Sequence, residues 1–258
     1  MHNAQHLPAG RQEIPNHKSR LLEFRAWGLI SHWELVIGVF TTHYILHTIY
    51  DILKPMDATP HPKHSHLKLK LCVSGAAETG HCGPNALDLA KELGREIARA
   101  NAVLVSGATT GFPLWATIGA KEAGGITIGL SPAASEQEHI EVYKLPVDYL
   151  DVIAYTGFGY SGRNLLLTRA SDAVFVGCGR IGTINEFTVA FEDRKPIGIL
   201  EGDWETDEVI KMILEKAHRP NDKIIFDSSP KALVARVVEL VKRDKERYSY
   251  LYESRLVQ

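Results

Sequence analysis

Strand-like and helix-like segments alternate from about residue 67 to residue 247, and this alternation is the strongest constraint on the fold. Short apolar runs, several of which end at glycine, are typical of strands, and the stretches between them carry apolar residues at helical spacing. Strict alternation predicts one doubly wound α/β domain, with a mostly parallel sheet and helices on both faces. The predicted strands are residues 67–74, 102–106, 125–130, 149–154, 173–176, 196–200 and 223–226, and the predicted helices are residues 84–100, 112–123, 163–170, 183–191, 208–216 and 231–242.

The first 66 residues differ in composition from this domain. Residues 1–20 are polar and aperiodic, which predicts disorder, and residues 54–66 are a proline-rich linker. Residues 21–53 are apolar, and the stretch 28–50 approaches the length of a bilayer span. Glu34, His32, His43 and His47 argue against a membrane, because each ionisable group at bilayer depth costs about 2 to 3 kcal/mol. We therefore expect a helical segment before the linker, and a tail at residues 248–258; a membrane anchor and a stretch foreign to the functional protein are the alternatives.

Charge and cysteine content narrow the partners. Lys and Arg number 29 against 31 Asp and Glu, a formal charge of −2, so no global field favours nucleic acid or anionic lipid. Cys72, Cys82 and Cys178 are an odd number without metal-ligand spacing. This pattern favours a cytoplasmic protein with reduced thiols. It predicts no metal site, no cofactor and no disulfide.

Glycine-rich loops follow four of the predicted strands. Glycine lets the backbone approach a phosphate closely, and the start of the next helix carries partial positive charge. A single glycine after a strand is more often turn chemistry, but four such loops at one edge of a sheet favour a phosphate or nucleotide site. None matches the dinucleotide or P-loop patterns. The candidate ligands in these loops are Gly75, Gly107, Thr110, Gly111, Gly157, Gly179, Arg180, Gly182 and Thr183.

Two short motifs offer side chains for chemistry. Thr183 and Glu186 fit a capping box at a helix start, and Glu186 also fits a carboxylate that acts on a glycosidic bond. Arg163 and Asn164 open a predicted helix after a glycine loop, where a guanidinium grips phosphate or carboxylate, unless it makes a surface ion pair. Cys178 is disfavoured as a nucleophile because no histidine stands in a neighbouring motif. The histidines of the domain, His81, His139 and His218, are scattered, and we expect solvent-facing or loop positions for them.

These motifs together resemble the LOG family. The segment 162–176 with its Gly-Arg-Asn start and its Asp-Ala strand, the segment Gly182-Thr183-Ile184-Asn185-Glu186, and the Lys-Pro at 195–196 carry the likeness, which is looser over residues 69–241 as a whole. The family and its Rossmann-like superfamily, which includes molybdenum-cofactor carriers and DNA-processing protein A, imply a nucleotide-binding fold and a homodimer. Family members release a free base and ribose 5-phosphate from nucleoside 5'-monophosphates.

The resemblance implies specific roles and also shows departures. Glu186 would be the catalytic carboxylate, Arg163 its partner at the ribose or base, and Gly179, Gly182 and Thr183 the phosphate cradle. Where the family has Pro-Gly-Gly this chain has Cys178-Gly179-Arg180, and Asn185 replaces an acid. Arg180 either adds a phosphate contact or fills the pocket. A nucleoside-monophosphate phosphoribohydrolase is therefore expected, with a non-catalytic binder of a nucleotide or phosphorylated cofactor as the alternative and a single-stranded DNA-binding module as the third.

Overall fold

The computed structural model describes residues 67–220 and 222–253, so the predictions for residues 1–66 and for the last five residues lie outside the described part. No helix in the described ranges is long and apolar enough to cross a bilayer. The elements are β1 Lys70–Ser74, α2 Ala86–Arg99, β2 Val103–Ser106, α3 Phe112–Glu122, β3 Ile126–Ser131, α4 Glu136–Glu141, β4 Val152–Tyr155, α5 Gly159–Ala170, β5 Ala173–Val176, α6 Ile181–Glu192, β6 Ile197–Leu200, α7 Thr206–Ala217, β7 Ile224–Asp227 and α8 Pro230–Glu253.

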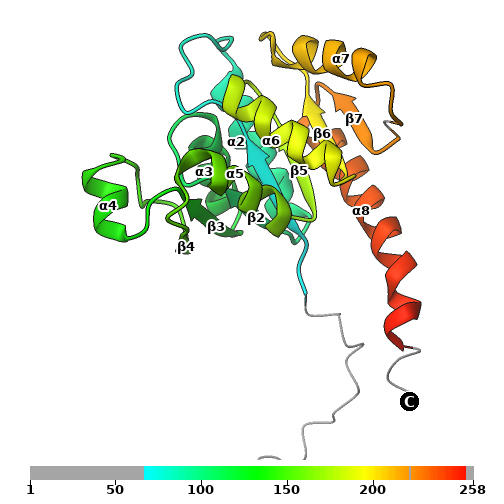
Figure 1. The fold of residues 1–258 in the computed structure, drawn as a ribbon, viewed down its shortest axis with the longest axis horizontal. Coiled ribbons are helices and arrows are strands. Elements are labelled where there is room, and N and C mark those ends of the chain that lie inside the picture. Colours follow the sequence, from blue (N-terminus) through cyan, green and yellow to red (C-terminus); the bar gives the residue numbers. More distant parts are fainter. Residues whose placement is uncertain (1–66, 221, 254–258) are drawn as a thin grey trace, which may run out of the picture. The chain divides into compact units, whose positions relative to one another are not determined.

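The strands form one parallel sheet in the order β4-β3-β2-β1-β5-β6-β7 (Figure 1). The chain builds outward from β1 to β4, then returns to the other side of β1 and continues outward from β5 to β7. Strand order thus reverses between β1 and β5, where Ser74 lies opposite Val176. This topology confirms the predicted doubly wound sheet. It also places the ends of β1 and β5 at the point where such sheets bind ligands.

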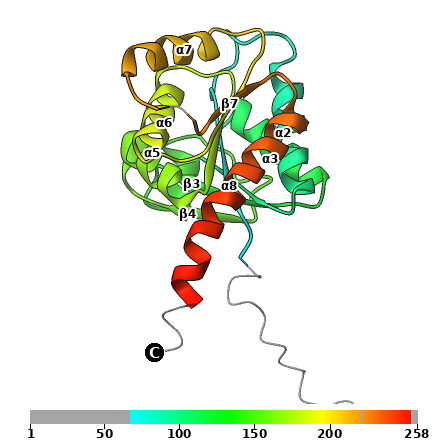
Figure 2. The same ribbon diagram turned by 90° about the vertical axis from the view of Figure 1, so that its right-hand side faces the viewer.

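Helices cover both faces of the sheet. Alternate residues of β1 point to opposite sides: Leu71 and Val73 pack with α2, α3 and α8, whereas Cys72 packs with α5, α6 and α7. Figure 2 shows α2 and α3 on the opposite side from α5 and α6. Because the central strands are buried on both faces, their sequences read as continuous apolar runs rather than as alternating ones. The predicted covering of both faces is therefore confirmed.

Helices α2 and α3 approach each other unusually closely at two glycines. A Cβ at Gly94 would overlap the carbonyl of Ala116, and a Cβ at Gly119 would overlap the carbonyl of Lys91. Backbone therefore lies against backbone at this crossing. Any side chain at either position must push the helices apart.

Two helices are clearly longer than predicted, and a third was not predicted. Helix α5 begins at Gly159 rather than at residue 163, because the segment that was taken for a glycine loop is already helical. Helix α4 was not predicted; Ser135 caps it by accepting a hydrogen bond from the Glu138 amide at 3.1 Å. Helix α8 has the expected start, with Ser229 accepting from the Ala232 amide at 3.3 Å, but runs to Glu253, beyond the predicted end at residue 242.

Candidate functional site

A cavity of about 510 Å3 opens at the carboxyl ends of β1 and β5, where the strand order reverses. Its walls come mainly from the loops after β1 and β2, from the start of α3 and from the first two turns of α5 and α6. Eight residues that the sequence singled out meet there although they lie up to 111 positions apart: Gly75, Gly107, Arg163, Asn164, Arg180, Gly182, Thr183 and Glu186. Val73, Ala76, Ala77, Thr109, Pro113, Tyr160 and Ile181, which were not singled out, complete the lining.

Glu186 lines this cavity and is 6% exposed. The Ser74 hydroxyl, at the end of β1, donates a hydrogen bond to its carboxylate. The Nη1 atom of Arg163, from α5, lies 3.4 Å from its Oε1 atom. Burial raises the pKa of the Glu186 carboxyl above its ordinary value, and Arg163 and Ser74 offset part of that rise. Three elements of the fold thus converge on one buried carboxyl group.

Asn164 adds an amide to the same group. In the orientation that satisfies both ends of the amide, its nitrogen donates to Glu186 Oε1 at 2.8 Å and to the Tyr160 carbonyl at 3.0 Å. Its other end faces Asn185 at 3.0 Å. Asn185, which replaces the acid of the LOG family, therefore belongs to the set of polar groups around Glu186. No second carboxylate lines this cavity among the described residues.

Arg163 is buried, at 5% exposure, and its position is set from two sides. Its guanidinium lies against Gly107, where a Cβ would overlap Nη1, and 5.8 Å from the ring of Tyr160. Since α5 begins at Gly159, Arg163 stands in the second turn of the helix. The prediction that Arg163 stands at the helix start is therefore wrong. Its Nε atom is buried without a hydrogen-bond partner in the described structure. The alternative of a surface ion pair is wrong, because the pair with Glu186 is buried.

The capping box predicted for Thr183 and Glu186 is not formed. Helix α6 begins at Ile181, Arg180 is its N-cap residue in extended conformation, and no side chain caps it. The first helical hydrogen bond of this end runs from the Ile184 amide to the Arg180 carbonyl at 3.0 Å. The amides of Ile181, Gly182 and Thr183 consequently have no acceptor within the helix, and all three residues line the cavity. Helix starts of this kind attract anions.

The remaining candidates from the glycine loops lie beside the cavity rather than on its wall. Thr110 donates to the Ala77 carbonyl at 3.0 Å, and Gly111, with φ +68°, sits close to the carbonyl of Ala76. Both residues hold the loop after β1. Gly157 has φ +69° and turns the chain after β4. It does not line the cavity.

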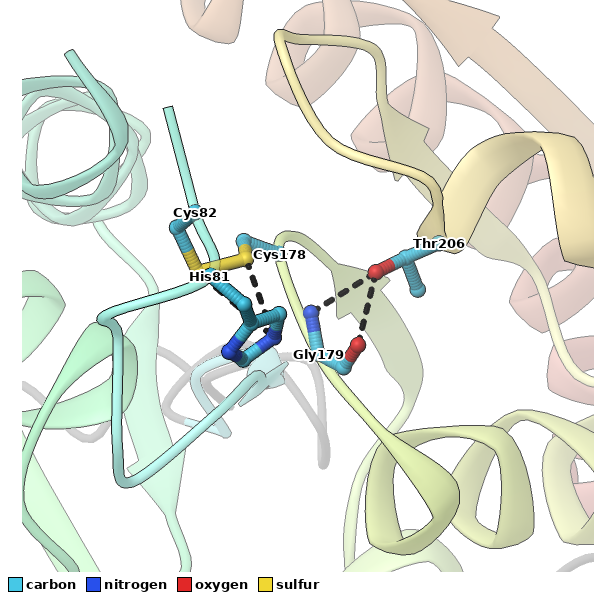
Figure 3. The surroundings of a disulfide bond; sticks show 5 residues. All are labelled: His81, Cys82, Cys178, Gly179 and Thr206. Atoms are coloured by element: carbon cyan, nitrogen blue, oxygen red, sulfur yellow. Dashed lines mark hydrogen bonds between the residues drawn. A yellow bond between two sulfur atoms is a disulfide. The ribbon is translucent and has the colours of Figure 1, made fainter. Parts of the chain in front are cut away.

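Gly179 and Arg180 border a second cavity of about 760 Å3, which Arg180 and Ile181 share with the first. The Thr206 hydroxyl bonds both the amide and the carbonyl of Gly179, at 2.8 and 2.9 Å (Figure 3). Arg180 is exposed and pairs with Glu78, from the loop after β1, at 2.7 Å. The loops after β1 and β5 are therefore joined at the mouth of the first cavity.

The expectation of reduced, unpaired cysteines is wrong. Cys82 and Cys178 form a disulfide, with their Cα atoms 5.9 Å apart. They are 96 positions apart in sequence, but β1 and β5 are neighbours in the sheet, so the loops that follow them meet. Figure 3 shows His81 beside the bond, with Nε2 3.6 Å from the Cys178 sulfur. A histidine thus does stand next to Cys178, contrary to the sequence prediction.

The other two histidines of the domain, His139 and His218, lie in different environments. His139 is fully buried, and its ring nitrogens lie 2.8 Å from the Ser131 hydroxyl and 3.0 Å from the Pro146 carbonyl. The solvent-facing or loop position predicted for it is wrong: it belongs to α4 and anchors that short helix to the end of β3. His218 is exposed and follows α7 in left-handed conformation, as expected of a loop residue.

Comparison with known proteins identifies a family and several proteins that the domain resembles. Residues 68–234 match the model of the SLOG cluster4 family. An uncharacterized protein of Archaeoglobus fulgidus is 28% identical over 133 residues, which are 52% of this chain and 82% of that protein. The molybdenum cofactor binding protein of Rippkaea orientalis is 28% identical with a TM-score of 0.57, over 69% of this chain and 99% of that one. The molybdenum cofactor carrier protein of Chlamydomonas reinhardtii is 28% identical with a TM-score of 0.55, over 68% and 99% of the two chains.

The resemblance inferred from the motifs is thereby confirmed at the level of the superfamily. DNA processing protein A of Streptococcus pneumoniae, 17% identical with a TM-score of 0.50 over 65% of this chain and 61% of that one, shares the fold. The family match covers more than half of the chain and includes β1, α5 and α6, which carry Ser74, Arg163 and Glu186. The chain belongs to the SLOG cluster4 family and has the Rossmann-like nucleotide-binding fold of its superfamily.

Proposed function

We propose that this protein binds a nucleotide or a similar phosphate monoester of a flat ring system in the 510 Å3 cavity, and holds the ligand without cleaving it. The start of α6 supports the position of the phosphate. The amides of Ile181, Gly182 and Thr183 lack acceptors within the helix, the Thr183 hydroxyl stands beside them, and Arg180 supplies a positive charge at the mouth. Tyr160 lines the same cavity and offers a ring against which a flat ligand can stack.

The carrying observation for a holding role is the environment of Glu186. Its carboxylate accepts from Ser74 and Asn164 and pairs with Arg163, so its oxygens are engaged by the protein. A carboxylate that stabilises an oxocarbenium ion or activates water needs a free oxygen toward the sugar. In this structure the Glu186 carboxylate would first have to exchange one of its bonds to Ser74, Asn164 or Arg163 for a contact with the sugar. Two solved relatives that match this chain at 28% identity are named as molybdenum cofactor proteins, which is consistent with a carrier.

Hydrolysis of a nucleoside 5'-monophosphate is the second candidate, and a specific observation favours it. Glu186 and Arg163 both line the cavity, at the positions where the LOG motif puts the catalytic carboxylate and its partner. Burial raises the pKa of Glu186, and a carboxyl group with a raised pKa can deliver a proton to a leaving base. In this reaction the bond between the base and C1' breaks and water supplies the hydroxyl group of ribose 5-phosphate.

One experiment separates the two functions. The protein is incubated with AMP, GMP, CMP, UMP and a cytokinin monophosphate, each product is separated by chromatography, and binding is followed by calorimetry. A carrier binds at least one compound and leaves it intact. A hydrolase releases free base, and Glu186→Gln abolishes the release. Neither binding nor release with any of the five compounds would contradict both functions.

A matched pair of variants tests the position of the phosphate. Thr183→Val removes a hydroxyl from a residue of the cavity wall, and Thr188→Val removes one from the same helix at a partly exposed residue that does not line the cavity. We expect Kd to rise on the order of tenfold for Thr183→Val, the loss of one hydrogen bond to a charged group. Thr188→Val should bind like the parent. Equal affinities in the two variants would move the phosphate away from α6.

We further propose that the protein is a homodimer that packs through α5. Phe158, Leu165 and Leu166, of α5 and its N-cap, and Ile181, at the start of α6, are apolar and exposed, Ile181 by 84%. Because Ile181 also lines the cavity, a second copy would complete its wall. Light scattering should report a dimer for the parent and a monomer for Leu166→Lys. Met212→Lys, an equally drastic change on the exposed side of α7, is the control and should stay dimeric.

A further inference from the structure

The Cys82–Cys178 bond joins the two loops that border the cavity on opposite sides. Cys82 lies in the loop after β1, which also carries Gly75, Ala76 and Ala77 of the cavity wall. Cys178 directly precedes Gly179 and Arg180 in the loop after β5. Further bonds tie the same segments: the Ala76 amide donates to the Cys178 carbonyl at 2.8 Å. The disulfide is therefore part of the frame that holds the cavity, and neither proposed function uses its sulfur chemistry.

We propose that Cys82 and Cys178 form a thiol–disulfide exchange site for low-molecular-weight thiols and disulfides of the glutathione class, and that the state of this pair sets the mobility of residues 75–83. The consequence for ligand affinity rests on the function proposed above, but the exchange itself does not.

Access to the pair is unequal, and this fixes the direction of attack. Cys82 is partly exposed, whereas Cys178 is fully buried. His81, which lines the second cavity, is exposed and places Nε2 3.9 Å from the Cys82 sulfur and 3.6 Å from the Cys178 sulfur. An incoming thiolate reaches Cys82, and the sulfur that leaves is Cys178, beside the imidazole (Figure 3). A neighbouring imidazole can supply the proton that the leaving thiolate takes up.

The exchange needs only the disulfide and two molecules of a small thiol, RSH. A thiolate RS⁻ attacks the Cys82 sulfur, the bond to Cys178 breaks, and Cys178 takes a proton through His81. A second thiolate attacks the mixed disulfide, so that RSSR leaves and Cys82 becomes a thiol. Two RSH are oxidised to RSSR, and the protein gains two electrons and two protons. Oxidation by RSSR runs through the same steps in reverse.

The disulfide is a covalent tie between the loop after β1 and the loop after β5. The ion pair between Glu78 and Arg180 also spans the gap, but the two side chains are 80% and 56% exposed, so the pair contributes little. Reduction leaves that pair, the hydrogen bond from the Thr110 hydroxyl to the Ala77 carbonyl and a few backbone hydrogen bonds to hold the loop. We therefore expect residues 75–83 to exchange their amide hydrogens faster in the reduced protein. In the reduced protein the loop must become ordered when AMP binds. Kd for AMP should therefore be higher than in the oxidised protein, on the order of threefold to tenfold.

The test begins with thiol counts on the full chain. The sequence holds three cysteines, and Cys72, whose pKa burial raises well above its ordinary value, is the unpaired one. Unfolded in denaturant without reductant, the protein should show one reactive thiol, and three after reduction. Titration with defined ratios of reduced and oxidised glutathione should convert Cys82 and Cys178 together. Three thiols in every ratio, or lasting mixed disulfides with glutathione, would overturn the exchange site.

Variants separate the roles of the residues. Cys72→Ala should keep the two-thiol transition, and Cys82→Ser should abolish it. His81→Asn should keep the thiol counts but slow the exchange on the order of tenfold, because the leaving thiolate loses its proton donor. An unchanged exchange rate would exclude His81 from the reaction.

Two further measurements complete the decision. Hydrogen exchange of residues 75–83 is compared between the oxidised and reduced protein, and equal rates would overturn the link to the loop. Failure of AMP to bind either state would count against the proposed function and leave that comparison intact. The reduced protein is also titrated with Co2+, because His81, Cys82 and Cys178 together offer three metal ligands. A stoichiometric complex with a thiolate-to-cobalt absorption band would make the cluster a metal site and overturn the assignment to thiol exchange.

Discussion

Replacement of Arg163 and Glu186, singly and together, tests whether the buried ion pair organises the site. The two side chains are 7% and 8% exposed, and their charged atoms are 3.4 Å apart. At an effective dielectric constant of about 20, charges at that separation attract by about 5 kcal/mol. Much of this offsets the cost of taking both groups out of water. Removing one partner leaves the other buried without it.

The magnitudes follow from that imbalance. We expect Arg163→Met and Glu186→Gln each to lower the free energy of unfolding by about 3 kcal/mol, the range for one partner of a buried pair. The double variant should lose less than the sum of the two, with a coupling energy of about 2 kcal/mol. Ser74 and Asn164 still bond the side chain at position 186 in the Arg163→Met protein, which keeps the expected loss toward the lower end.

Urea unfolding followed by circular dichroism measures all four proteins of the cycle. The control is the pair of Arg169 with Asp193, which joins α5 to the end of α6 at 3.0 Å but has Arg169 61% exposed. Arg169→Met and Asp193→Asn should couple by less than about 1 kcal/mol, as exposed pairs do. Additive losses for Arg163 and Glu186, with a coupling energy below about 0.5 kcal/mol, would refute the reasoning.

Three further outcomes follow from the structure. Gly107→Ala should displace the Arg163 guanidinium, lower the free energy of unfolding by about 1 to 3 kcal/mol and weaken AMP binding; unaltered calorimetry would contradict this. Gly94→Ala should be destabilising despite a gain of about 1 kcal/mol in helix propensity, because its Cβ meets the Ala116 carbonyl, and a higher melting temperature would speak against the close crossing. Since burial raises the pKa of Glu186, its contribution to stability is full below the unfolded pKa, about 4.3, and declines as pH rises toward the folded pKa. The stability of the parent relative to Glu186→Gln should therefore fall with rising pH, and a constant difference between pH 4 and 7 would count against a raised pKa.

The fold was largely predictable because its central strands are buried on both faces. Continuous apolar runs such as Ala173–Val176 leave few alternatives, and glycine marks several of their ends. The features that the sequence did not predict depend on a local balance between loop and helix or on tertiary contacts. Gly159 and Gly162 suggested a loop, yet both belong to α5, where Gly162 packs on Phe158. Helix α4 is too short for a periodic pattern, and its anchor His139 is buried through tertiary contacts.

The residues of the site also fall into those that the sequence predicted and those that it did not. Arg163 and Glu186 could be found because they belong to motifs that lie close together in the sequence. Ser74 could not, since its partner is 112 positions away and a serine at a strand end has many ordinary roles. The disulfide escaped for a related reason: the odd number of cysteines argued against pairing, but two of three can pair when their strands are neighbours. Knowledge of the strand order would have supplied both contacts.

The reversal of strand order between β1 and β5 has a kinetic consequence. The segment from β1 to β4 can pair its strands successively, whereas β5 must return across the sheet to reach β1, closing a loop of about a hundred residues. Contacts between such distant segments form slowly, because the entropy of closing the loop is lost before the contact compensates for it. Ser74 meets Glu186 only after this step. A nascent chain that has not yet emerged beyond β4 therefore contains four strands of the sheet in sequence and no binding site, and acquisition of ligand marks the completion of the central pairing.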